Sequence, residues 1–320
     1  MHKFLCTGSA KSGLMGCMRN YLTEYRYDLQ RTFTGTSGTP PEWVPRLAEG
    51  NDAGYHLPGS AVWAVHGSMA TIVAGIRVLL MQSLHPGALA GVYEHSGFKE
   101  DPLGRLASTV RWIFTVTYGS KEAAEAATYR VRKIHEHVRG SYVDGTGASH
   151  HYSANDPELL RWVHVTYADS FLRANRIWGR PIPGGPDAYV REWAQAGRLM
   201  GVEDPPLTEA QVRQELEAWY ASGILRSDER LAETIAFIRR PPLSPLLQPG
   251  YRILFAAAVA SLEPKYRDML GLRPARLGPI PLPAVTTARA VLGMVRLALG
   301  SHGPSELAAR RRLQRLGYAV

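Results

Sequence analysis

Residues 156–176, DPELLRWVHVTYADSFLRANR, have the pattern of one long, partly buried helix. Asp156, Pro157 and Glu158 are residue types favoured at a helix N-terminus, as a cap, in the first turn and beside the positive end of the helix dipole. Apolar and aromatic residues then recur at three- and four-residue spacing, and His164 lies on the same stripe. The segment therefore predicts an amphipathic helix that carries a histidine on its buried face.

The rest of the chain continues this helical pattern, and clean strand alternation is nearly absent. Ser120, Thr208 and Ser227 are expected to cap helices, Thr208 in a capping box with Gln211. Residues 141–155 are expected to form a loop and 272–283 a connection. The other expected helices cover residues 60–84, 86–93, 103–118, 121–139, 187–199, 209–220, 228–239, 250–262, 264–270, 285–299 and 305–316. This pattern predicts a single all-α domain of about ten helices.

The positive charge is concentrated near the C-terminus. The chain carries a formal net charge of +9, and residues 264–320 hold ten basic and two acidic residues. We expect the last arginines, Arg310, Arg311, Arg312 and Arg315, to form a solvated helix face; an anionic partner or membrane surface is the alternative. Zinc-finger spacing and RNA-binding aromatic motifs do not occur, so nucleic acid is not an expected partner.

The N-terminal region and the cysteines bear on cellular location. No apolar run of signal-peptide length follows the first basic residues. The apolar region 61–93 is interrupted by polar and charged residues and ends at Leu84-His85-Pro86, so a buried core helix is expected rather than a membrane span. Cys6 and Cys17 are too few to staple a fold of 320 residues, which favours a reducing compartment. We expect a soluble, cytoplasmic protein.

Several common kinds of active site are excluded by motif. His135-Glu136-x-x-Arg139 has arginine where a zinc protease needs its second histidine. The Glu-x-x-His pairs of di-iron bundles, a Gly-rich nucleotide loop after a strand and the Gly-x-Ser-x-Gly elbow do not occur.

Histidines on apolar faces are the remaining candidates. In the expected helix 121–139, His135 shares a stripe with Ala127, Val131, Ile134 and Val138, and Arg139 follows one turn later. A single inward histidine is most often a hydrogen-bonded core residue. Two on successive helices, His135 and His164, together with His85 at a proline break, favour ligand chemistry. An imidazole on an apolar stripe with an arginine nearby suits a heme, whose propionates pair with guanidinium groups.

Four ordered blocks of the chain resemble one known family. They are RVLLMQSLHPGALAGVYEHSGF (77–98), DPLGRL (101–106), RVRKIHEHVRG (130–140) and DPELLRWVHVTYADS (156–170). Together they resemble the catalytic domain of the rubber oxygenases (latex-clearing proteins) and MpaB-type oxygenases over roughly residues 55–300. That range predicts an extension at residues 1–50, a heme-binding domain at 51–300 and a basic helix at 301–320.

The resemblance implies a distantly globin-like helical fold around heme b. It implies that His135 is the proximal iron ligand and that Arg139, just after it, lies in the heme pocket. It also implies polar groups from residues 77–96 on the other side of the iron, with His85 as the candidate, and a place near the heme for His164. The remaining predicted cofactor contacts are Arg77, Val131, Arg132 and Val138.

The resemblance also has limits. The distal glutamate and lysine of the polyisoprene-cleaving members have no matched positions in this chain, which argues against rubber as substrate. The span of the membrane-anchored members is likewise not matched.

These features predict a heme-b-dependent oxygenase or oxidase that acts on an apolar or aromatic small molecule with dioxygen. His85, His164 and Arg139 are the expected catalytic groups. The resemblance connects such proteins with secondary metabolism, such as cyclic dipeptide tailoring. Three alternatives stay open: a heme-dependent dehydrogenase that forms a double bond, a non-catalytic heme-binding or gas-sensing protein, and an all-α interaction protein that uses its basic tail.

Overall fold

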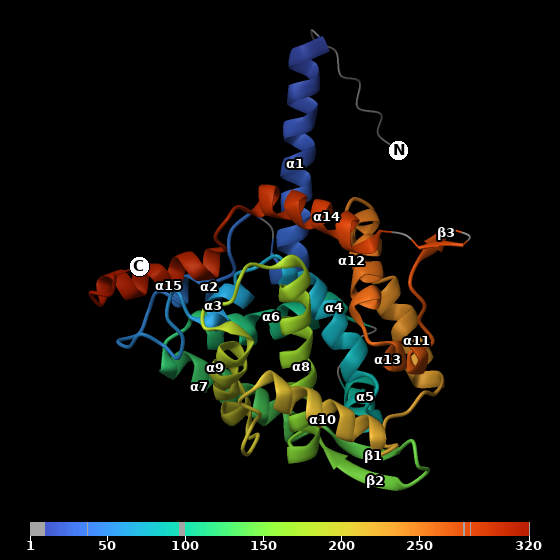
Figure 1. Ribbon diagram of the computed structural model, residues 1–320. Coiled ribbons are helices and arrows are strands. Elements are labelled where there is room, and N and C mark those ends of the chain that lie inside the picture. The colour runs from blue at the N-terminus through green and yellow to red at the C-terminus, as the bar shows by residue number, and fades with distance from the viewer. Residues whose placement is uncertain (1–9, 37, 96–99, 278, 282, 320) are drawn as a thin grey trace.

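The computed structural model describes residues 10–36, 38–95, 100–277, 279–281 and 283–319, with the side chains of 10–19, 277, 280 and 281 left out. It is predominantly α-helical, with two short antiparallel hairpins (Figure 1). The predicted all-α class is confirmed. The elements are α1 (Ala10–Thr34), α2 (Trp43–Arg46), α3 (Ala61–His66), α4 (Ala70–Gln82), α5 (Pro86–His95), α6 (Pro102–Tyr118), α7 (Lys121–His135), β1 (Arg139–Val143), β2 (Ser149–Ser153), α8 (Pro157–Trp178), α9 (Gly185–Met200), α10 (Glu209–Ala221), α11 (Glu229–Arg239), α12 (Gln248–Ser261), α13 (Pro264–Met269), β3 (Arg276–Leu277), β4 (Ile280–Pro281), α14 (Ala284–Leu299) and α15 (Pro304–Arg315).

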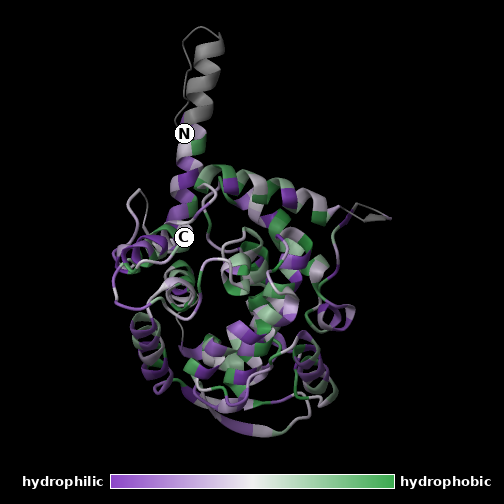
Figure 2. Ribbon diagram, turned by 60° about the vertical axis from the view of Figure 1, so that its left-hand side comes forward, coloured by the Kyte–Doolittle hydropathy of each residue, from purple (hydrophilic) through white to green (hydrophobic). Residues whose placement is uncertain are grey.

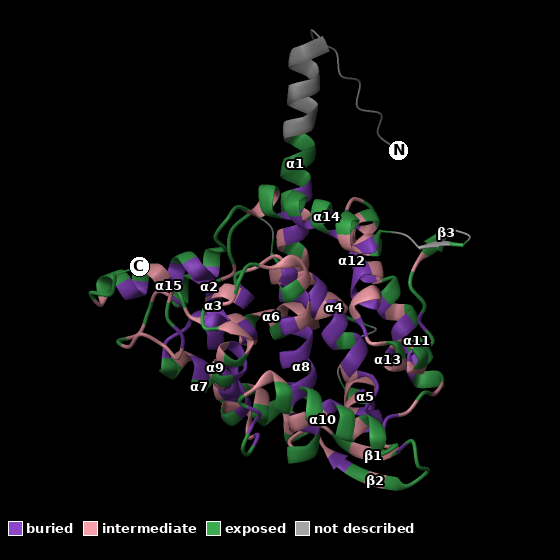
Figure 3. Ribbon diagram, viewed as in Figure 1, coloured by how far each residue is buried: buried purple, intermediate pink, exposed green. Residues whose placement is uncertain are grey.

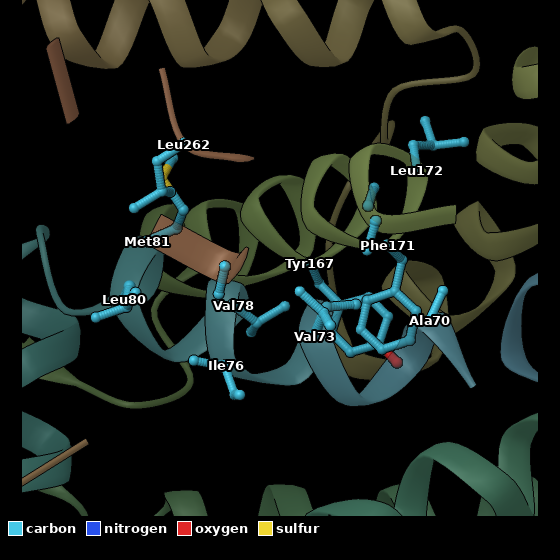
Figure 4. Close-up of a cluster of buried hydrophobic side chains, with 14 of the residues drawn as sticks. Ala70, Val73, Ile76, Val78, Leu80, Met81, Tyr167, Phe171, Leu172 and Leu262 are labelled. Atoms are coloured by element: carbon cyan, nitrogen blue, oxygen red, sulfur yellow. The ribbon is translucent and has the colours of Figure 1, made fainter. Parts of the chain in front are cut away.

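The centre of the molecule is the pair α4 and α8, which are largely buried (Figure 3). Apolar side chains of α4 lie beside the rings of Tyr167 and Phe171 from α8 (Figure 4). The outer helices carry both hydrophilic and hydrophobic residues, as amphipathic helices do (Figure 2). The predicted long helix 157–176 is therefore confirmed as a core element.

A buried ion pair joins the two central helices. Arg77 of α4 is completely buried, and its Nη1 lies 2.5 Å from Oδ2 of Asp169 on α8. The same nitrogen donates a hydrogen bond of 2.8 Å to Oγ of Ser170. A guanidinium buried in this way requires its partners, since an unpaired buried charge costs several kcal/mol, about 3–5 when one partner is removed. Arg77 is thus built into the α4–α8 contact.

Several predicted boundaries are confirmed and others are wrong. Helix α5 begins at Pro86 as expected, and Thr208 and Gln211 form the capping box before α10. The expected helix 60–84 is two helices, because the chain breaks at residues 67–69 between α3 and α4. Asp228, one residue after the expected Ser227, caps α11.

The expected helix 121–139 and loop 141–155 are the largest errors. Helix α7 ends at His135, and Arg139 begins the hairpin β1–β2, whose register pairs Arg139 with Ser153. Tyr152, in β2, belongs to a small apolar cluster with Ala90 of α5 and Leu159 of α8, against which Tyr142 and Val138 also pack. Burial of these side chains under the hairpin overrides the helical pattern, a tertiary effect that propensity does not capture.

The ends of the chain pack against the domain. Tyr25 and Leu29 of α1 are buried with Val295 of α14, while the N-terminal half of α1 extends away from the other elements (Figure 1). Ala308 and Leu313 of α15 are buried with Leu47, Trp63 and Tyr118. Cys6 lies outside the described residues, as does the side chain of Cys17.

The expectation that the C-terminal arginines form a solvated face is wrong for Arg312, whereas Arg311 and Arg315 are exposed as expected. Arg312 is 1 % exposed. Its guanidinium donates hydrogen bonds to the carbonyl oxygens of Leu47, Ala53 and Tyr118. Arg315 donates to the carbonyls of Ala48 and Gly50, and Arg310 is paired with Glu306. Arg312 and Arg315 thus tie α15 to the segment 47–53, and Arg312 also ties it to the end of α6.

Within the described residues, no single helix is both long and apolar enough to cross a bilayer. Helices α4 and α5 would meet that test only together, and they are bent by 105° at their junction.

Candidate functional site

His135 is the last residue of α7, at the point where the chain turns toward the hairpin. Its ring is half-buried, and its Nδ1 is fully buried without a hydrogen-bond partner. Burial is the main reason why the pKa of His135 is lowered, and the nearby positive charge of Arg105 lowers it further. The Asn155 side chain and the Ala154 backbone, facing the ring, oppose this shift. His135 is thus held as a neutral imidazole, the form that binds metals.

Arg105 is a site residue that the sequence analysis missed. Helices α6 and α7 are joined by two residues and pack against each other in antiparallel fashion, and Trp112 Nε1 donates to Thr128 Oγ1 at 3.1 Å. Arg105 precedes Trp112 by seven residues, and His135 follows Thr128 by seven, so the two are level across the pair. Burial lowers the pKa of the Arg105 guanidinium. Arg105 lies in the DPLGRL block. Counting seven residues back from Trp112 would have identified it, once α6 and α7 are recognised as an antiparallel helical hairpin.

Helix α4 presents an open, apolar face on the side away from α8. Gly75 and Leu79 lie about 160–200° around the helix from Arg77, which points at α8. A Cβ placed on Gly75 would have no atom within 4 Å, and Leu79 is 45 % exposed in a helix whose other apolar residues are mostly buried. Space of this kind is suited to an apolar ligand.

His85 lies elsewhere, beneath the hairpin. Its ring is completely buried among Tyr142, Trp162 and Trp219. Nδ1 accepts a hydrogen bond from the backbone N–H of Gly87 at 3.1 Å, so Nε2 carries the proton, and Nε2 has no partner. Burial lowers the pKa of His85 to about 4.

His164 points from α8 toward α9, as the stripe predicts. Its ring lies against Gly197, where a Cβ would come within 2.9 Å of Cε1. Its Nε2 is buried without a partner, and burial, followed by the charges of Arg161 and Arg198, lowers its pKa to about 4. No contact described in the structure joins His164 or His85 to His135.

The remaining predicted residues have other surroundings. Arg139 is exposed on β1, where its Nε donates to the carbonyl of Glu136, so it is not one helical turn beyond His135 as expected. Ile134, placed on the buried stripe, is 66 % exposed. Arg132 is exposed, and Val131 and Val138 are half-buried. The structure therefore brings together His135, Arg105 and Asn155, and not the trio of His135, His85 and Arg139.

A comparison with known families matches residues 63–297 to the family described as "ER-bound oxygenase mpaB/B'/Rubber oxygenase, catalytic domain". The chain belongs to this family. The match confirms the resemblance and agrees with the expected range of roughly 55–300. It supports an oxidoreductase of the oxygenase kind. No curated protein and no solved structure matches the chain.

The site lies inside the matched oxygenase domain, whereas α1, α2 and α15 lie outside it. In the part of the chain that the structure describes, no three His, Cys, Asp or Glu side chains are grouped so as to hold a metal ion. A porphyrin supplies four ligands of its own and needs only one imidazole from the protein. A half-buried, neutral imidazole whose Nδ1 is enclosed by protein, and a cation level with it on α6, fit the requirements of a heme.

Proposed function

We propose that this family member is a heme-b-dependent oxygenase or oxidase of an apolar or aromatic small molecule, with His135 as the iron ligand. The observation that carries the proposal is the state of His135 inside the matched oxygenase domain: the ring is neutral and half-buried, and its Nδ1 is enclosed by protein, which leaves Nε2 for iron. When bound, a heme would supply the iron centre that activates dioxygen.

The chain's own residues would bind the cofactor and orient the substrate. His135 would hold the iron through Nε2, and the end of α7 would fix the ring. Arg105 would pair with a carboxylate of the cofactor or stabilise negative charge that develops beside it, the role expected earlier of Arg139. The face of α4 around Gly75 and Leu79 would exclude water and bind the apolar part of a substrate.

His85 and His164 stay candidates for moving protons. His85 offers a buried N–H without an acceptor, which is the arrangement of a donor awaiting a partner. We further propose a role in small-molecule metabolism in the cytoplasm, with dioxygen as co-substrate.

The visible absorption spectrum of the purified full-length protein tests the cofactor. Wild type and His137→Ala should show a heme band, and His135→Ala should lose it. His137 is the matched control because it lies two residues away, is exposed, and its ring Nδ1 bonds the carbonyl of Lys133. A heme band that survives in His135→Ala and is lost in His137→Ala would overturn the ligand assignment.

Turnover separates the enzyme from its alternatives. Incubation of the heme-loaded protein with aromatic cyclic dipeptides and ¹⁸O₂ should give products that carry the label. Products two hydrogens lighter without label would indicate a dehydrogenase, and reversible gas binding without product would indicate a sensor.

A further inference from the structure

The loop that follows the hairpin is fixed across the end of α7. Ala154 N–H donates to the carbonyl of Val138 at 2.9 Å, and Asp156 Oδ2 accepts from Ser153 N–H at 2.7 Å. These bonds place residue 155 beside the last turn of the helix. The loop is therefore held by its backbone, independently of what the side chain of Asn155 does.

The amide of Asn155 has only one possible orientation. Its Nδ2 donates to the carbonyl of Arg132 at 3.1 Å, and a carbonyl can only accept. Oδ1 is consequently the atom of the amide that remains to accept a hydrogen bond. That oxygen is buried and has no hydrogen-bond partner in the described structure, and neither has Nδ1 of His135.

Two unsatisfied atoms of opposite hydrogen-bonding character thus lie at one contact. An amide oxygen is an acceptor, so the pair is satisfied only if Nδ1 of His135 carries the proton. Each atom left unpaired would cost about 1–3 kcal/mol, and a hydrogen bond between the two would remove both costs. The Asn155 side chain opposes the lowering of the His135 pKa, which is the effect of a hydrogen-bond acceptor beside the ring.

We propose that Asn155 is a positioning residue for His135: its Oδ1 takes the Nδ1 proton, which fixes the ring and leaves Nε2 as the nitrogen that binds iron. The inference rests on the proposed function for the identity of the bound metal. It assigns the tautomer and ring orientation to a residue outside the predicted site. Partners of this kind commonly account for about 10–100-fold in metal affinity.

The test is the tautomer of His135 in the cofactor-free, full-length protein, read from ¹⁵N chemical shifts of labelled histidines and assigned with His135→Gln. Wild type should carry the proton on Nδ1. Asn155→Ala should populate the other tautomer. Asn155→Asp keeps the acceptor oxygen and loses the donor to Arg132, so it should retain the wild-type tautomer. Asn175→Ala, which removes a buried asparagine whose Nδ2 bonds the Arg180 carbonyl, is the control and should change nothing.

Heme affinity gives a second measurement. Asn155→Ala should bind heme about 10–100-fold more weakly, with a thermal midpoint near wild type, and Asn155→Asp should restore most of the loss. If Asn155→Ala keeps the Nδ1 proton, the Ala154 carbonyl is the acceptor and the inference is wrong. If Asn155→Asp fails as Asn155→Ala does, the residue acts only through Arg132. Absence of heme from wild type would overturn the proposed function and leave the tautomer result intact.

Discussion

At the scale of single residues, the site depends on charges and protons that surround one imidazole. Burial and the Arg105 cation both favour the neutral ring of His135. Arg105 has a second consequence, since a half-buried guanidinium attracts an anionic group that enters the site. Removing Arg105 should therefore change both the pKa of His135 in the cofactor-free protein and the affinity for heme.

Arg105→Met should raise the pKa of His135 in the cofactor-free protein, because it removes a neighbouring positive charge. It should also weaken heme binding by about 10–100-fold, the equivalent of one charged hydrogen bond of about 1.5–3 kcal/mol. NMR titration and heme titration measure the two effects. Arg111→Met, on the same helix but exposed, is the control. An unchanged heme affinity would remove Arg105 from the cofactor site.

His85 predicts a pH dependence of stability. Its pKa is about 4 when folded and about 6.5 in an unfolded chain, so between these values only the unfolded state binds the proton. Above pH 6.5 the titration of His85 does not change the free energy of unfolding. As the pH falls from 6.5 to about 4, it lowers that free energy progressively, by at most about 3 kcal/mol. Urea unfolding of His85→Phe should therefore show a flatter loss of stability between pH 6.5 and 4. The same slope in both proteins would contradict this.

At the scale of elements, the hairpin β1–β2 is locked to the connection between α10 and α11. Gly145 N–H donates to the carbonyl of Ile224 at 2.9 Å. A Cβ on Gly145 would lie 2.2 Å from the Gly223 carbonyl oxygen and 2.3 Å from that of Leu225. These are backbone atoms, which cannot turn aside as a flexible side chain does.

Gly145→Ala should lower the free energy of unfolding by about 2–3 kcal/mol, because strand and connection must separate. Gly147→Ala is the matched control in the same turn. Its φ is +91° and a Cβ there meets nothing within 4 Å, so it should cost only about 1–2 kcal/mol of backbone strain. Thermal or urea unfolding measures both variants. Equal losses of unfolding free energy would show that the close approach of the backbone at Gly145 does not affect stability.

Local signals predicted much of this architecture. The Asp156-Pro157 start of α8, the Pro86 start of α5 and the Thr208 capping box are each confirmed in position. The Asp156 side chain, however, accepts from Ser153 N–H and does not cap the first turn of α8. The hairpin was missed because Tyr142 and Tyr152 favour strand only when Ala90 and Leu159 are there to cover them. Arg105 was missed for a similar reason, since its place opposite His135 arises from the pairing of α6 with α7.

At the scale of the whole molecule, Arg312 connects three distant segments through backbone carbonyls. Arg312 lies on the helix face of Ala308 and Leu313, whereas Arg311, one residue earlier, is exposed. The difference comes from the carbonyls of Leu47, Ala53 and Tyr118, which converge only in the folded chain. Counting basic residues therefore predicted the positive charge of this helix but not which arginine is buried.

Arg312→Met should lower stability by about 3–5 kcal/mol, since it leaves buried carbonyls without a donor. Arg311→Met should stay within about 0.5 kcal/mol of wild type. Deletion of residues 304–320 should cost more than Arg312→Met, because it also uncovers the cluster around Leu47 and Trp63. The thermal midpoints of the three proteins test the order. A truncated protein as stable as wild type would show that α15 is dispensable.

The link from Arg312 to the Leu47 carbonyl spans 265 residues. During translation, at about 5–20 residues per second, the loop that contains Leu47 leaves the ribosome roughly 10–50 s before the arginine that completes it. Throughout that interval α15 cannot cover the cluster around Leu47 and Trp63, and these apolar side chains stay accessible to chaperones. A chain shortened by a premature stop or by proteolysis at the C-terminus lacks the bond from Arg312 to Leu47. Such a chain should therefore be degraded faster than the full-length protein.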